Sequence, residues 1–245
     1  MNHPLLYLPS VENTNTWARE HLERFGDLGA VYTTSQTAGR GRRGHTWVNA
    51  AGQALYYSCV VQQPLVQPET LPLLSCLVTA KVLHGVYGID CRIKWPNDLL
   101  LNGKKIVGIL CEGVPDRGAW ILGIGINLAQ PQSYFDGAGL PHGASLLTSG
   151  VRVCAERDAD VLAAGLTEPG FSAVMPRFAR EGIGPFLADY RTHCVNLGRH
   201  VSYDGGEGTA LDVDAEGRLV VCDDATGEQH IFTGEVSVRG IYGAV

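Results

Sequence analysis

The chain of 245 residues is 45% hydrophobic and carries 25 acidic against 19 basic side chains, for a net charge of −6. A chain of this length buries about 70% of its extended surface, so it needs no disulfide framework or structural metal to fold. Seven cysteines, never closer than 15 residues apart, exclude CxxC zinc and redox motifs. No basic leader and no apolar run of about 18 residues is present, so we expect a reduced, cytoplasmic protein without signal peptide or membrane span.

The first half of the chain alternates between helical and strand patterns. Ala18, Leu22 and Phe25 recur at helical spacing behind a cap at Asn13 or Thr14. Runs of β-branched and aromatic residues predict strands further on, and an Asn-Gly pair between two of them predicts a tight hairpin. The predicted elements are a helix over 13–26, strands over 30–35 and 54–61, a helix over 70–87, and strands over 91–95, 99–101, 105–114 and 120–128.

The second half changes in character near residue 196. Gly and Ser dominate 133–150, which predicts a surface loop, and 155–193 has a helical pattern with breaks near Pro169, Pro176 and Pro185. Five short strand-like runs then follow in about fifty residues, which predicts a small barrel. We therefore expect two domains, 1–195 and 196–245, of which the second carries nine acidic and three basic side chains.

Positive charge is concentrated in two places in this acidic chain. No acidic residue occurs between Leu28 and Pro68, and the middle of that stretch reads GRGRRG. Three of the four lysines, Lys94, Lys104 and Lys105, lie within twelve residues of one another. A local positive site in an acidic protein indicates a small anionic ligand rather than a nucleic-acid backbone.

The GRGRRG loop, residues 39–44, matches the GxGxxG pattern of dinucleotide-binding proteins. That pattern requires a helix that begins at the loop and an acid about twenty residues later, and HTWVNAAGQ followed by no acid before Glu69 supplies neither. No GK[ST] sequence is present, so a Walker loop is also excluded. What remains is a flexible loop with three guanidinium groups, suited to hold phosphate or carboxylate and to close over a ligand.

Two further motifs carry candidate site residues. In KWPND, Pro96 ends a strand and leaves Asn97 and Asp98 at its mouth. In the next strand, alternation places Lys105 on the face of Val107 and Ile109, and Ile106, Gly108 and Leu110 on the opposite face. The strand GIGIN, residues 123–127, has two glycines at which a ligand could approach the backbone.

Together these motifs resemble the biotin–protein ligases, also called biotin–[acetyl-CoA-carboxylase] ligases. The resemblance runs in the family's order from SVENTN (10–15) through GRGRRG (39–44), KWPNDLLLNGKKIVGILCE (94–112) and GIGIN (123–127) to GEVSVRG (234–240). It implies an α+β fold, with a mixed β-sheet flanked by helices as in the class II synthetase-like biotin and lipoate ligases, and a small C-terminal SH3-like barrel. Because the chain has no room for the winged-helix domain that some members carry, we expect a short form without a nucleic-acid partner.

The resemblance implies a reaction in two steps. Biotin and ATP form biotinyl-5′-AMP and pyrophosphate, with Mg²⁺ on the phosphates, and a lysine of a carboxylase's biotin carboxyl carrier domain then takes the biotinyl group. The acid-free arginine loop and the lysines would offset the repulsion between a carboxylate and a polyphosphate. A homodimer is possible, but the sequence does not identify the edge strands.

The resemblance also assigns roles to individual residues. For biotin, these are Asn13, Thr14, Asn15, Gln36, Gly39, Arg40, Gly41, Arg42, Lys105, Gly108, Gly123 and Gly125. For ATP, they are Arg40, Arg42, Arg43, Trp47, Lys94, Asn97 and Asn127. Catalytic roles fall to Lys105, Arg40, Lys94 and Asp98, with Asp98 either deprotonating the incoming amine or capping a turn. Asn13 departs from the family, which more often has Ser or another small residue there.

Two alternatives remain open. A lipoate or octanoyl protein ligase shares the fold and also acylates a carrier lysine, although it would not ordinarily combine GRGRRG with KWPND. A non-catalytic biotin-binding module is the other alternative, and the presence of both Lys105 and Asp98 argues against it.

Overall fold

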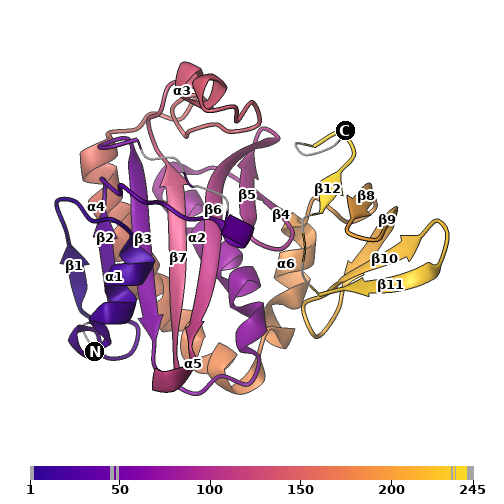
Figure 1. Cartoon of the computed structure of the whole chain (residues 1–245), viewed down its shortest axis with the longest axis horizontal. Helices are drawn as coiled ribbons and strands as arrows, with labels where there is room; N and C mark the ends of the chain where they lie inside the picture. Colours follow the sequence, from indigo (N-terminus) through magenta and orange to yellow (C-terminus); the bar gives the residue numbers. More distant parts are fainter. Residues whose placement is uncertain (1–2, 45–46, 48–49, 233, 235, 242–245) are drawn as a thin grey trace.

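The computed structural model describes residues 3–44, 47, 50–232, 234 and 236–241. Figure 1 shows a large sheet backed by helices, with a smaller sheet beside it at the C-terminal end. The large sheet has the order β1-β2-β3-β7-β6-β5-β4, in which β1 pairs with β2 in parallel and all other neighbours are antiparallel. Its strands are β1 (Leu5–Tyr7), β2 (Ala30–Thr33), β3 (Ala54–Val61), β4 (Arg92–Lys94), β5 (Asp98–Leu101), β6 (Lys104–Val114) and β7 (Ala119–Asn127).

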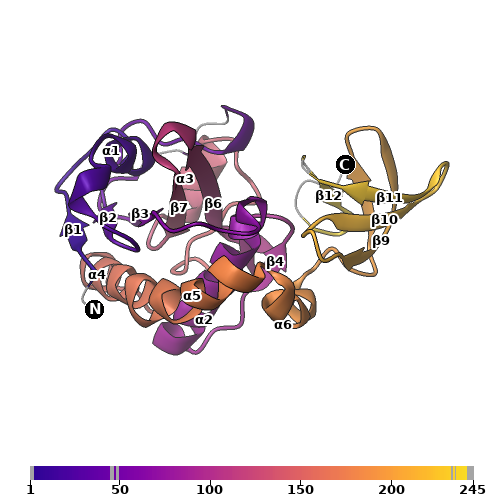
Figure 2. The ribbon, with the colours of Figure 1, turned by 90° about the horizontal axis from the view of Figure 1, so that it is seen from below.

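Helices cover both faces of this sheet, but unequally (Figure 2). On one face lie α2 (Leu71–Tyr87), α4 (Ala155–Gly165) and α5 (Ser172–Glu181), and α6 (Leu187–His193) lies near β4. On the other face α1 (Thr14–Glu20) packs on β3 and β7. Because both faces are covered, every residue of β3 is buried, which explains its continuous run of strand-forming apolar residues.

The helix α2 is the most apolar of the described helices. Among the described residues, Pro68–Tyr87 is the one helical stretch whose length and composition would allow it to cross a membrane, and 56% of that window is buried inside the protein. Its apolar side chains, such as Leu74 and Leu83, belong to the main core. A core helix of this kind passes a hydropathy test without spanning a bilayer.

The smaller sheet is antiparallel, with the order β11-β10-β9-β8-β12. Its strands are β8 (His200–Tyr203), β9 (Gly206–Val213), β10 (Leu219–Asp223), β11 (Gly227–Ile231) and β12 (Ser237–Val238). Trp95 joins it to the large sheet, because its backbone N–H donates to Asn196 Oδ1 at 2.8 Å and its indole N–H donates to the Gly217 carbonyl at 3.0 Å. The predicted fold class, a helix-flanked mixed sheet followed by a second small β-structure, is confirmed.

Three local expectations differ from the structure. The predicted surface loop over 133–150 contains α3 (Gln132–Gly137) and buries Phe135 and Leu146. These apolar residues were overlooked because the sequence around them is rich in Gly and Ser. The three-residue strand β1 was not predicted, because so short a run carries no alternation. Pro176 lies inside α5 and does not end it.

Candidate ligand-binding site

A cavity of about 440 Å³ opens on the face of the large sheet that carries α1, which is a typical volume for a small-molecule pocket. The residues predicted to bind ligands that line it are Asn13, Thr14, Asn15, Gln36, Arg40, Gly41, Arg42, Trp47, Lys94, Asn97, Asp98, Lys105, Gly108, Gly123, Gly125 and Asn127. Gly39 does not line the cavity. A side chain at position 39 would overlap the carbonyl oxygen of Trp47. The side chain of Arg43 lies outside the described residues.

One end of the cavity, the amide end, is formed by Asn13, Thr14, Asn15 and Gln36. Asn13 caps α1, because its Oδ1 accepts from the Thr16 backbone N–H at 3.0 Å. The backbone N–H and the hydroxyl of Thr14 both donate to Gln36 Oε1, at 2.9 and 3.1 Å. All four side chains of the amide end are at most 6% exposed, so a ligand here meets polar groups that are already oriented.

Asn15 is held by contacts on both sides of its amide. Its nitrogen donates to Glu112 Oε2 at 2.7 Å and to the Leu110 carbonyl at 3.2 Å, and its oxygen accepts from the Ser58 hydroxyl at 2.6 Å. A side chain at Gly123 would overlap that amide. Gly123 therefore makes room for Asn15 on the floor of the amide end.

The opposite end, the charged end, contains Lys105 and Asp98. Lys105 Nζ lies 2.7 Å from Asp98 Oδ1, and the two side chains are 27% and 11% exposed. Two groups predicted to act on the substrate are thus paired with each other in the protein without ligand. An ammonium held in this way is pre-oriented, and part of its charge is already compensated.

The predicted side-chain alternation along β6 is wrong at Lys105. Leu99 pairs with Val107 but Leu100 pairs with Lys105, so Ile106 has no partner in β5 and forms a bulge. A bulge adds one residue and reverses the alternation beyond it. Lys105 therefore lies on the same face as Gly108, within reach of the cavity, while Val107 and Ile109 pack into the core.

Arg42 and Asn97 connect the glycine–arginine loop (39–44) to the charged end. Arg42 Nη1 donates to Asn97 Oδ1 at 3.1 Å, and Asn97 Nδ2 donates to the Ile109 carbonyl at 2.8 Å. Lys94 lies opposite Asp98 in the pairing of β4 with β5. Lys94, Lys105 and Arg42 thus line the same end of the cavity as Asp98, and this excess of positive charge makes the end attractive to an anion.

Arg40 has a different place from Arg42. Its Nη2 donates to the Thr16 hydroxyl at 2.9 Å and lies 3.9 Å from Glu112 Oε1, so its guanidinium lies beside α1 and not beside the lysines. The predicted group of three arginines around one anion is therefore separated, with Arg40 on the α1 side and Arg42 at the charged end.

Trp47 lies between the two ends. Its backbone N–H donates to the Gly39 carbonyl at 3.0 Å, which folds the glycine–arginine loop back on itself. A Cβ on Gly125 would lie 2.9 Å from the indole, and one on Gly108 would overlap it. The indole centre is also 5.3 Å from Lys105 Nζ, within the range of a cation–π contact. In this structure the two glycines make room for an aromatic ring.

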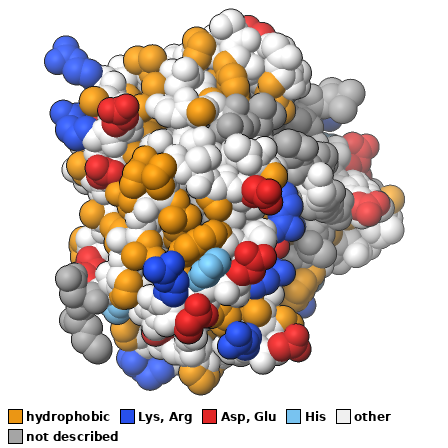
Figure 3. Space-filling model, turned by 60° about the vertical axis from the view of Figure 1, so that its left-hand side comes forward, with side chains coloured by type: hydrophobic (Ala, Val, Ile, Leu, Met, Phe, Trp, Pro, Cys, Tyr) orange, Lys and Arg blue, Asp and Glu red, His pale blue; other side chains and the backbone are white. Residues whose placement is uncertain are grey.

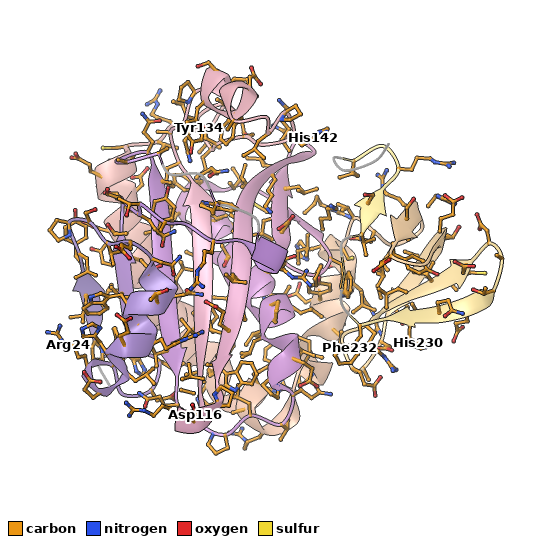
Figure 4. All side chains as sticks on the ribbon, in the orientation of Figure 1. Arg24, Asp116, Tyr134, His142, His230 and Phe232 are labelled. Atoms are coloured by element: carbon orange, nitrogen blue, oxygen red, sulfur yellow. The ribbon has the colours of Figure 1, made fainter. Side chains whose placement is uncertain are left out.

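The sequence prediction missed the wall formed by the segment after β7. Tyr134 and Phe135 of α3 line the cavity with their rings 5.3 Å apart, and Figure 4 shows Tyr134 and His142 at the same end of the large sheet. The Lys105 N–H donates to the His142 carbonyl at 2.9 Å, so this segment pairs with the start of β6. An aromatic pair within a Gly- and Ser-rich stretch was the signal available in the sequence.

Asn127 holds this wall in place. Its Nδ2 donates to the Ala144 carbonyl at 3.0 Å, and its Oδ1 accepts from Gln130 Nε2 at 2.9 Å. The small sheet also contributes, because Gly234, Val236 and Ser237 of the GEVSVRG motif line the cavity, although no ligand-binding role was predicted for them. The whole site can therefore hold a ligand with a polar, uncharged end, an aromatic part and an anionic part.

The chain is similar in sequence and fold to several known proteins. The Biotin/lipoate A/B protein ligase family matches residues 7–128. A biotin–[acetyl-CoA-carboxylase] ligase of Paracoccus denitrificans is 31% identical over 251 residues, which cover 95% of this chain and 100% of that protein. The bifunctional ligase/repressor BirA of Bacillus spizizenii is 35% identical over 141 residues, and this match covers 55% of this chain and 43% of that longer protein. The biotin protein ligase of Aquifex aeolicus in complex with biotin and ATP has the same fold, with a TM-score of 0.77 at 23% identity over 96% of this chain and 98% of that one.

Proposed function

The chain belongs to the biotin/lipoate protein ligase family, and from this and the site we propose that it is a biotin–protein ligase. It activates biotin with ATP to biotinyl-5′-AMP and transfers the biotinyl group to a lysine of a carboxylase's biotin carboxyl carrier domain. The observation that carries the proposal is a single cavity with buried amides at one end and the Lys105–Asp98 pair at the other.

Biotin fits this polarity along its whole length. Its ureido ring needs donors and acceptors that are fixed in advance, and Thr14, Asn15 and Gln36 supply them at the amide end. Its valerate chain is apolar and would cross the middle of the cavity towards Lys105. Such a pocket would reject analogues lacking the ureido ring, since those could not form the hydrogen bonds that the oriented polar groups offer to a ligand.

ATP would occupy the rest of the cavity. Trp47, Tyr134 and Phe135 supply aromatic surface for adenine, and Lys94 and Arg42 are placed for the phosphates. Mg²⁺ would enter with ATP, because it prefers phosphate oxygens and water over an all-protein cage.

In the first step, a carboxylate oxygen of biotin attacks the α-phosphorus, and the bond to the pyrophosphate oxygen breaks. Both reactants are anions, so the site must neutralise charge that accumulates between them. Lys105 is the group best placed to do so, because it is already oriented by Asp98 at 2.7 Å. Pyrophosphate leaves with its own negative charge, which Lys94 and Arg42 would stabilise.

In the second step, the carrier lysine attacks the carbonyl carbon of the anhydride, and AMP leaves with the bridging oxygen. The amine must lose a proton, and Asp98 is the carboxylate at that end of the cavity. Asp98 would accept the proton as the amide bond forms. The same carboxylate thus orients Lys105 for the first step and serves the amine in the second.

We also propose that the enzyme acts in the cytoplasm, where the acyl acceptor is a soluble carrier.

The sheet order leaves β1 at one edge of the large sheet, whereas β4 at the other edge lies beside the small sheet. Figure 3 shows the β1 side, where hydrophobic side chains gather between scattered charges, and Tyr7 of β1 is 52% exposed. We propose that a homodimer would pair through this edge of the large sheet. Sedimentation measurements of molecular mass on Tyr7→Lys should then show a shift to monomer.

An ATP–pyrophosphate exchange assay tests the first step without any carrier. We expect exchange that depends on biotin and that lipoate or octanoate neither supports nor inhibits. Exchange supported equally by lipoate would instead identify an acyl ligase of the same fold. Binding of biotin without any exchange would identify a non-catalytic module.

A further inference from the structure

Glu112 lies on β6 beyond the cavity lining and touches two parts of the site at once. Its Oε2 accepts from Asn15 Nδ2 at 2.7 Å, and its Oε1 lies 3.9 Å from Arg40 Nη2. The Arg19 guanidinium approaches the same Oε1 at 3.4 Å from the outer side. One carboxylate therefore joins the floor of the amide end to the glycine–arginine loop.

Helix α1 supplies the other half of this arrangement. Residues 15, 16 and 19 lie within about one turn, so Asn15, Thr16 and Arg19 all face Glu112 or Arg40. The Thr16 hydroxyl accepts from Arg40 Nη2 at 2.9 Å. Arg40 thus fixes the start of the loop to α1 by a hydrogen bond with a hydroxyl and to β6 by an ion pair with Glu112.

The burial of these groups indicates that Glu112 orients its neighbours and contributes little to the free energy of folding. The Glu112 side chain is 21% exposed, and those of Arg19 and Arg40 are 41% and 50% exposed. Ion pairs with such access to water contribute little to folding. The bond to Asn15 is different, because Asn15 is 5% exposed and Glu112 Oε2 is the nearer of the two oxygens that accept from its amide nitrogen, at 2.7 Å against 3.2 Å for the Leu110 carbonyl.

We propose that Glu112 is a positioning residue for the activation step. Its Oε2 fixes the Asn15 amide at the amide end, and its Oε1, together with Thr16, anchors the glycine–arginine loop through Arg40. The proposal rests on the function proposed above, and it gives the two arginines different tasks. Arg40 anchors the loop on the α1 side, whereas Arg42 reaches the charged end through Asn97.

Variants at three positions separate the two contacts of Glu112. E112A removes both contacts, whereas E112Q keeps an acceptor for Asn15 and loses the charge beside Arg40. T16V removes only the hydroxyl that Arg40 contacts. R19Q is the control for loss of the outer guanidinium. Each variant is assayed for the KM of biotin and the kcat of biotinyl-AMP formation, and for hydrogen exchange of the amides of residues 39–44 without ligand.

A second control matches the loss of charge. Asp116 lies in the turn after β6, at the end of the sheet opposite Tyr134 (Figure 4). D116N removes one exposed carboxylate near the same strand without touching the site. Any effect of E112Q that D116N shares is therefore a general effect of net charge.

We expect E112A to raise the KM for biotin about tenfold, with a smaller change in kcat, and to speed exchange in the loop about tenfold. E112Q and T16V should speed exchange in the loop while the KM for biotin stays within about twofold. R19Q and D116N should match the unmodified enzyme in both measurements. In a double-mutant cycle, E112Q should add little to the loop exchange of R40Q, because both remove the same contact.

Two results would overturn the proposal. One is an E112A enzyme with unchanged KM and loop exchange. The other is an E112A enzyme that only melts at a lower temperature, because that would make Glu112 a structural residue. If the unmodified enzyme forms no biotinyl-AMP, the proposed function fails. The comparison of amide hydrogen exchange in residues 39–44 still tests whether Glu112 anchors the loop.

Discussion

The two ends of the cavity are built on different principles. At the amide end each polar side chain already has a protein partner: the Thr14 hydroxyl donates to Gln36, the Asn15 nitrogen donates to Glu112, and the Asn15 oxygen accepts from Ser58. At the charged end, Lys105 pairs with Asp98, and Lys94 and Arg42 line the cavity beside that pair. The first end is arranged before the ligand arrives, whereas the second has positive charge that an anion would complete.

This difference determines which substitutions should be most damaging. Loss of a preformed hydrogen bond weakens binding of one substrate, and the loss is limited to about 1–3 kcal/mol. Loss of a charge that acts on the developing negative charge of the reaction lowers the rate itself. We therefore expect larger effects on kcat at the charged end and larger effects on the KM for biotin at the amide end.

The largest effect is expected at Lys105. Lys105→Ala should lower the rate of biotinyl-AMP formation about 10²–10³-fold, as for removal of a group that stabilises transition-state charge. Lys104→Ala is the matched control, because Lys104 is exposed, does not line the cavity, and donates to Gln132 Oε1 at 3.3 Å. Pyrophosphate exchange measures both variants, and equal losses in the two would refute the assignment of Lys105.

Asp98→Asn should separate the two steps of the reaction. The amide keeps an oxygen that can still accept from Lys105, so adenylation should fall about tenfold or less. It cannot take a proton from the incoming amine, so transfer to the carrier should fall about 10²-fold. Single-turnover measurement of each step is the test. An equal fall in both steps would restrict Asp98 to holding Lys105.

Arg42→Gly should affect retention of the intermediate more than its formation. The change removes the contact with Asn97 and adds backbone freedom, so the glycine–arginine loop should open faster over biotinyl-5′-AMP. Escaped anhydride would then label lysines of a bystander protein that lacks a carrier domain, several-fold above the unmodified enzyme. If the variant simply stops forming biotinyl-AMP, Arg42 belongs to the chemistry and not to the loop closure.

At the amide end, Thr14→Val should raise the KM for biotin about tenfold with little change in kcat. The substitution keeps the shape of the side chain and leaves Gln36 Oε1 with only the backbone N–H of residue 14. Steady-state exchange at varied biotin concentration measures the split. A fall in kcat with unchanged KM would contradict the proposed contrast between the two ends.

The smallest effect concerns the cysteines outside the site. Burial raises the pKa of Cys59, Cys91 and Cys111 to about 12, so these thiols stay protonated and unreactive at pH 8. Cys154 and Cys222 are exposed. Brief treatment of the native protein with iodoacetamide should therefore label these two positions, as read by peptide mass spectrometry, and leave activity unchanged. Labelling of the buried three in the native protein would contradict the packing of the core.

The sequence was most informative where local pattern and environment agree. The strand predicted over 54–61 is found as Ala54–Val61, because a buried central strand needs a continuous run of strand formers. The helix predicted over 70–87 is found as Leu71–Tyr87, with its first turn marked by a proline. Most of the residues that the motifs singled out also line the cavity, since glycines and charges stand out in a sequence.

The sequence was least informative where the site depends on pairing between distant segments. The bulge at Ile106 arises from the register of β6 against β5 and from the bond of Lys105 to His142, and neither leaves a trace in period-two alternation. The wall at Tyr134 was hidden by the Gly and Ser around it. Glu112 was read only as part of a motif, because its two contacts come from a helix and a loop far away in the chain.

The most direct test of the account is the mass of a biotin carboxyl carrier domain after incubation with the protein, biotin and MgATP. We expect one biotinyl group on one lysine, formed only when ATP is present and lost with Lys105→Ala. A carrier domain of unchanged mass, from a protein that binds biotin and folds normally, would contradict the claim that this cavity performs both activation and transfer.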